Sequence, residues 1–82
     1  MSTDYSKMTT KALVDQARAI VPQLIAARPG DILNFGTDVS HMTLWAQGQS
    51  ELPEDQIREV ATGLLRARDE IEAAKKEAEG GK

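Results

Sequence analysis

The most constraining feature of this sequence is a long amphipathic pattern that begins at Pro53 and runs almost to the C-terminus. Pro53-Glu54-Asp55 is typical of a first helical turn, where proline is tolerated and carboxylates favour the positive end of the helix dipole. Apolar residues then recur with helical spacing and form one stripe: Ile57, Val60, Ala61, Leu64, Leu65 and Ile71, continued by Ala74 and Ala78. The pattern predicts a long C-terminal helix, whose last turns project from the body because their apolar side chains shrink to alanine.

The composition favours one small all-α domain. Aromatic residues make up 4% of the 82 residues and β-branched runs are few, which argues against a sheet protein. The chain has no cysteine, which excludes disulfides and thiolate metal sites. The polar N-terminus carries no apolar signal core and no apolar run reaches the length of a membrane span, so we expect a cytoplasmic protein. We expect residues 9–78 to form the domain, between a segment at 1–8 that is disordered or loosely docked and a disordered tail at 79–82.

The segment before Pro53 predicts further, shorter helices. Thr9 or Thr10 can cap a helix with an apolar stripe from Leu13 to Ile25. Pro22 falls inside this stripe and either bends the helix or divides it into two.

A break at residues 28–31 separates the first helix from a short second one, which Gly36 would end as a left-handed C-cap. Asp38 would cap a third helix, closed by Gly48. With the long C-terminal helix this makes a four- to five-helix domain. Gly63 within the long helix costs about 1 kcal/mol against alanine, which indicates either the close approach of another helix or a neutral accident.

One ungapped pattern covers residues 35–64. Its members are an apolar Phe35 before Gly36, a capping residue at Asp38, buried positions at Met42 and Trp45, a turn at Gly48, Pro53, and the apolar triplet Ile57, Ala61 and Leu64. This pattern resembles the helix-turn-helix of the Cro and lambda-repressor-like family. The resemblance implies a helix-turn-helix core and a non-enzymatic, DNA-binding transcriptional regulator or repressor that forms a homodimer through the C-terminal helix.

The resemblance also implies which residues would meet double-stranded DNA and which would meet a second subunit. The implied DNA contacts are Arg18, Arg28, Asp38, Val39, Ser40, Thr43 and Leu44. The implied dimer or partner interface consists of Trp45, Leu64, Leu65, Ile71 and Ala74. The sequence departs from the family at Pro22, in the middle of the first helix. The expected recognition helix, residues 38–47, contains no Lys or Arg, so it offers no bidentate arginine to guanine.

The net charge of −3 favours a second interpretation. Neither half of the chain is basic, so nothing attracts phosphate over long range. The chain would then be an acidic helical inhibitor or adaptor that binds another protein through the Trp45 surface or the projecting C-terminal helix. His41 is the only histidine, and no nucleophile, paired-acid or metal-ligand spacing accompanies it. We therefore expect no enzymatic activity, no cofactor and no metal site.

Overall fold

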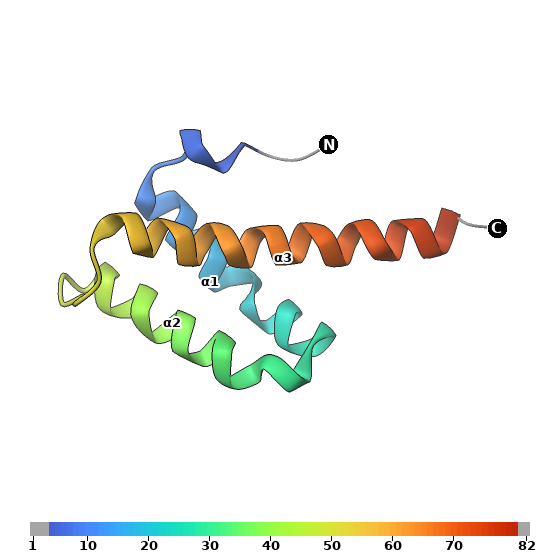
Figure 1. Ribbon diagram of the computed structural model, residues 1–82, viewed down its shortest axis with the longest axis horizontal. Helices are drawn as coiled ribbons and strands as arrows, with labels where there is room; N and C mark the ends of the chain where they lie inside the picture. The colour runs from blue at the N-terminus through green and yellow to red at the C-terminus, as the bar shows by residue number, and fades with distance from the viewer. Residues whose placement is uncertain (1–3, 81–82) are drawn as a thin grey trace.

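The computed structural model describes residues 4–80, which form three α-helices and two short 3-10 turns without any strand (Figure 1). The elements are η1 (Tyr5–Lys7), α1 (Thr10–Ala27), η2 (Pro29–Asp31), α2 (Ile32–Ala46) and α3 (Glu54–Gly80). The all-α prediction is confirmed. Helices α1 and α2 both pack against the first part of α3, and the last turns of α3 run past their ends (Figure 1). Among the described residues, no helix combines the length and apolarity needed to cross a bilayer.

Helix α1 begins at the predicted cap. The side chain of Thr9 accepts a hydrogen bond from the amide of Ala12 at 3.1 Å, which satisfies one of the free donors of the first turn. The helix continues without a break through Pro22, so the single-helix alternative is the one observed. Pro22 lies on the exposed side of the helix. Because proline has no backbone amide hydrogen, the carbonyl four residues earlier loses its donor, and water can take that place.

Helix α2 differs from the prediction. Residues 32–46 are one continuous helix, so the turn expected at Gly36 and the cap expected at Asp38 are both wrong. Unbroken, the helix buries Phe35 and Met42 and packs Val39 and Trp45 against the core. This burial outweighs the roughly 1 kcal/mol that an interior glycine costs. The described residues therefore contain three α-helices rather than four or five, and the helix-turn-helix core expected from the pattern at residues 35–64 is not confirmed.

The end of α2 follows the prediction. Gly48 has φ 75°, the left-handed conformation that glycine adopts without strain. Its amide donates to the carbonyl of Trp45 at 3.0 Å, and the amide of Gln49 donates to the carbonyl of Leu44 at 2.8 Å. This pair of bonds is the Schellman motif, which satisfies the last carbonyls of a helix.

The core lies where the three helices meet, with the N-terminal segment closing one end. Its buried apolar residues are Tyr5, Leu13, Val14, Ala17, Ile20, Val21, Leu24, Phe35, Met42, Ile57, Ala61, Leu64 and Leu65. The apolar ring of Tyr5 fills a place in this core, so residues 4–8 follow the docked alternative. The remaining part of that expectation, residues 1–3, lies outside the described residues. At the other end Glu79 and Gly80 are helical, and residues 81–82 also lie outside them.

Candidate interaction surface

The outer face of α2 carries the large apolar side chains that the domain leaves in water. Within residues 4–79, these are Leu33, 83% exposed, Ile32, 51% exposed, and Leu44, 38% exposed. Leu33 and Leu44 lie on the same side of the helix, with Thr37 and Ser40 between them at spacings of four, three and four residues. We call Leu33, Thr37, Ser40 and Leu44 the outer α2 stripe.

The middle of the outer α2 stripe is less polar than its composition indicates. The hydroxyl of Thr37 donates to the backbone carbonyl of Leu33 at 3.0 Å, so its polar group is already satisfied within the helix. Gly36 flanks the stripe, and a Cβ placed there would meet no atom within 4 Å. The stripe is therefore a shallow surface with an apolar side chain at each end and small side chains between them.

The exposed side chains of α2 include no charged group. They are Ile32, Leu33, Asn34, Thr37, Ser40, Leu44 and Ala46, with Gly36 between them. The ionisable side chains of this helix are Asp38 and His41, and both are half-buried. Burial raises the pKa of Asp38, although the charge of His41 acts in the opposite direction. A helix face of this length without exposed charge is suited to contact with protein rather than with water alone.

The residues expected to bind DNA do not form one surface. Val39 packs against the core, and Asp38 and Thr43 are half-buried, because these positions flank the side of α2 that faces the core. Ser40 and Leu44 are exposed.

The expected phosphate contacts lie outside α2. Arg18 and Arg28 are both exposed on or just after α1. The guanidinium of Arg28 lies 3.7 Å from a carboxylate oxygen of Glu70. The structure thus brings two of the seven expected DNA residues, Ser40 and Leu44, into one stripe.

The residues expected to form a dimer interface belong mostly to the core. Leu64 and Leu65 are buried between the helices, so they are not available to a second subunit. Trp45 and Ile71 are half-buried and pack against the core, while Ala74 is exposed on the projecting part of α3. The sequence reasoning missed Leu33, because a helix break at Gly36 would have separated it from Leu44. Their spacing in an unbroken helix is the signal that could have found the stripe.

A second surface feature is a shallow groove of about 620 Å³ between η1 and α3. Its lining includes Arg58, whose guanidinium donates to the hydroxyl of Thr10 at 3.1 Å and to the carbonyl of Ser6 at 3.2 Å. The hydroxyl of Thr10 in turn donates to Glu54 at 2.6 Å. These bonds attach the N-terminal segment to α3.

Comparison with protein-family models, with curated proteins and with solved structures finds no match for this chain. Among the described residues, no three His, Asp or Glu side chains gather in a way that could hold a metal ion. The functional argument therefore starts from the outer α2 stripe.

Proposed function

We propose that this chain is a small protein-binding module that accepts a partner helix on the outer α2 stripe. The observation that carries this proposal is the exposure of Leu33 on a helix face without exposed charge. Leu33 adjoins the exposed Ile32, exposed apolar patches mark interaction sites, and depletion of charge characterises the centre of protein interfaces.

The spacing of the stripe supports a helical partner. Alternating steps of four, three and four residues form the kind of seam by which helices pack side by side. The small side chains of Thr37 and Ser40 allow a second helix to approach closely between Leu33 and Leu44. A domain of 82 residues also gains stability from a partner, because it buries a smaller share of its surface than a larger domain does.

Binding of double-stranded DNA by a dimeric regulator is the alternative that a test must separate. Helix α2 contains no Lys or Arg, and both Arg28 and Arg58 already engage groups of this chain. Phosphate contacts supply most of the affinity of proteins for DNA, so the outer α2 stripe is poorly suited to this role.

Site-specific photo-crosslinking tests the proposal. A benzophenone-bearing residue is placed at Ser40 on the stripe and, as the control, at Glu59 on the exposed side of α3. In the cells that make the protein, we expect crosslinks to protein from position 40, reduced by Leu33→Asp, and few from position 59. Equal crosslinking from both positions contradicts the proposal.

The DNA alternative is tested with the purified chain and a pool of random duplex DNA at low and moderate salt. We expect no sequence-selective binding. Selective, salt-dependent binding that is lost in Ser40→Glu with Thr43→Glu would overturn the protein-binding proposal in favour of the regulator.

A further inference from the structure

We propose that residues 4–8 form a detachable strap, and that the slot which holds Tyr5 on α3 binds a tyrosine-bearing segment of another protein when the strap is released. The inference does not depend on the proposed function, because η1 and α2 lie on opposite sides of α3 (Figure 1). Three observations carry it: the polar end of the Tyr5 slot, the local turn within the strap, and the completeness of the helices that carry it.

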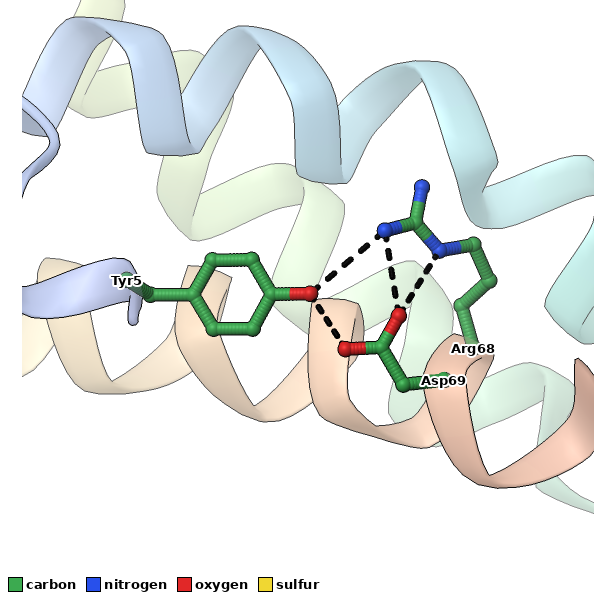
Figure 2. Close-up of polar contacts among 3 residues, drawn as sticks. All are labelled: Tyr5, Arg68 and Asp69. Atoms are coloured by element: carbon green, nitrogen blue, oxygen red, sulfur yellow. Dashed lines mark hydrogen bonds and ion pairs between the residues drawn. The ribbon is translucent and has the colours of Figure 1, made fainter. Parts of the chain in front are cut away.

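The Tyr5 slot combines apolar surroundings with a polar end that fits a phenol. Tyr5 is 3% exposed, so the core encloses its ring. The hydroxyl donates to a carboxylate oxygen of Asp69, and the guanidinium of Arg68 donates to the phenol oxygen at 3.4 Å (Figure 2). The phenol oxygen is therefore donor and acceptor at once, and phenylalanine has no atom that could replace it. The slot thus selects tyrosine rather than any aromatic ring.

The strap holds a turn of its own. A carboxylate oxygen of Asp4 accepts the amide of Ser6 at 3.1 Å and the hydroxyl of Ser6 at 2.5 Å. The amide of Met8 donates to the carbonyl of Tyr5 at 3.1 Å. Local bonds of this kind preorganise a short segment without help from the rest of a chain. A peptide with aspartate before its tyrosine and serine after it can therefore present the ring in the same way.

The helices that carry the strap are complete without it. Thr9 caps α1 with its own side chain, which accepts the amide of Ala12. The hydroxyl of Thr10 donates to Glu54 at 2.6 Å, so α1 and α3 are joined directly. Chain termini that are held by few side chains open at a lower free energy than the whole domain. The strap can therefore be released while the domain stays folded.

A segment of another protein suits the Tyr5 slot better than the strap of a second copy. Exchange of straps between two copies replaces each contact with the same contact, while association costs translational and rotational freedom. A different protein can add contacts, because the shallow groove between η1 and α3 is lined by Tyr5 and also by α3 residues from Asp55 to Arg66. A segment longer than the strap can occupy this groove as well as the slot.

Peptide binding to the full chain with Tyr5→Ala tests the proposal. The probe is a capped peptide with the sequence of residues 4–9, and the NMR shifts of the amides of Arg68 and Asp69 report binding. We expect saturable binding at millimolar peptide, and at least about tenfold weaker binding to the wild type, whose own tethered strap occupies the slot. No binding to the Tyr5→Ala chain, or equal binding to the wild type, would overturn the proposal.

A second peptide, with phenylalanine in place of the tyrosine, tests the selection of the phenol. We expect it to bind about fivefold more weakly, as is usual for the loss of a hydrogen-bonding hydroxyl. With Asp69→Ala added to Tyr5→Ala, the two peptides should bind almost equally, because the acceptor is gone. Glu72→Ala is the matched control, since it removes an exposed carboxylate one turn further along α3 and should leave the difference unchanged. Equal binding of both peptides to the Tyr5→Ala chain contradicts a tyrosine-selective slot.

Unfolding of the Tyr5→Ala chain tests whether the strap is separable. We expect a helical chain by far-UV circular dichroism, whose urea midpoint rises toward that of the wild type as the peptide is added. A chain that is unfolded without the peptide would show that the helices depend on the strap, and the detachable strap would be wrong. A folded chain that the peptide does not stabilise would contradict the slot.

Discussion

The phenol hydroxyl of Tyr5 donates a hydrogen bond to a carboxylate oxygen of Asp69, which joins two residues 64 positions apart in the chain (Figure 2). The guanidinium of Arg68 completes the cluster, 3.4 Å from the phenol oxygen and 3.2 Å from the other carboxylate oxygen. Burial acts to lower the pKa of Arg68, but its bonds to Asp69 and Tyr5 outweigh burial and raise it. The charged cluster lies at the hydroxyl end of the buried Tyr5 ring, so it fixes the N-terminal segment on α3.

Tyr5→Phe should lower the free energy of unfolding by about 1 kcal/mol, because it removes the hydroxyl that bonds to Asp69 and Arg68 and keeps the ring. Tyr5→Ala should lower it by about 3 kcal/mol, because it also empties the place that the ring occupies in the core. Urea unfolding followed by circular dichroism measures both. Lys7→Ala, at an exposed position of η1, is the control and should change little. An unchanged midpoint in Tyr5→Ala would mean that the segment does not contribute to the fold.

Asp38→Asn should stabilise the protein at neutral pH. Burial raises the pKa of Asp38, so the folded chain retains this proton at a pH where the unfolded chain has lost it. The stability that this difference gives is present at low pH and is lost as the pH rises through the folded pKa. Asparagine cannot ionise, so it avoids this loss of stability. We expect the free energy of unfolding to rise by about 0.5 kcal/mol at pH 7, a small gain because the side chain is partly in water.

The gain from Asp38→Asn should shrink below about pH 4 and be nearly gone at about pH 3, where most of the aspartate is protonated in both states. Thermal unfolding at pH 7 and pH 3 measures the difference. Glu59→Gln removes the same charge at an exposed position and controls for the net charge of −3. Equal stabilisation by both variants would assign the effect to net charge and contradict a role for the burial of Asp38.

The sequence was a good guide wherever a local signal decided the structure. The capping hydroxyl of Thr9, the glycine at position 48 and the proline before α3 each act through their own backbone neighbours. Leu64 and Leu65 follow the amphipathic pattern of α3, and their burial could be predicted from their spacing. The pattern could not tell whether they pack in the monomer or between subunits, because either arrangement buries the same stripe.

The sequence misled where tertiary packing overrode local preference. Gly36 and the capping types Thr37, Asp38 and Ser40 locally favour a break, but the joint burial of Phe35 and Met42 keeps α2 continuous. The helix-turn-helix interpretation depended on that break. The outer α2 stripe could not be predicted for the same reason, since a break at Gly36 would separate its two ends. No pattern in the sequence predicts that Tyr5 docks on α3. Its partner Asp69 lies 64 positions away, and a single tyrosine forms no periodic apolar pattern.

Gly48→Ala should lower the free energy of unfolding by about 1 kcal/mol. A Cβ at φ 75° is strained, and the two Schellman hydrogen bonds at the end of α2 depend on that conformation. Thermal or urea unfolding measures the effect. Gly30→Ala is the control: its φ is not positive, and a Cβ there would meet no atom within 4 Å. If both variants lose the same stability, the left-handed conformation of Gly48 is not the cause.

Gly63→Ala should raise the free energy of unfolding by about 1 kcal/mol, the difference between alanine and glycine inside a helix. Gly63 lies in the middle of α3 on the groove beside η1, and a Cβ there would meet no atom within 4 Å. No other helix of the described chain approaches closely at this position, so the neutral explanation for this glycine holds within the domain. Urea unfolding measures the gain.

Gly36→Ala makes the matched comparison, because it adds the same methyl group at another open helical position. Both variants should stabilise the chain by a similar amount, since neither added methyl group meets another atom. Urea unfolding measures both effects. If Gly63→Ala instead loses stability, its methyl group must meet another atom of the folded chain, which contradicts the open space at this position.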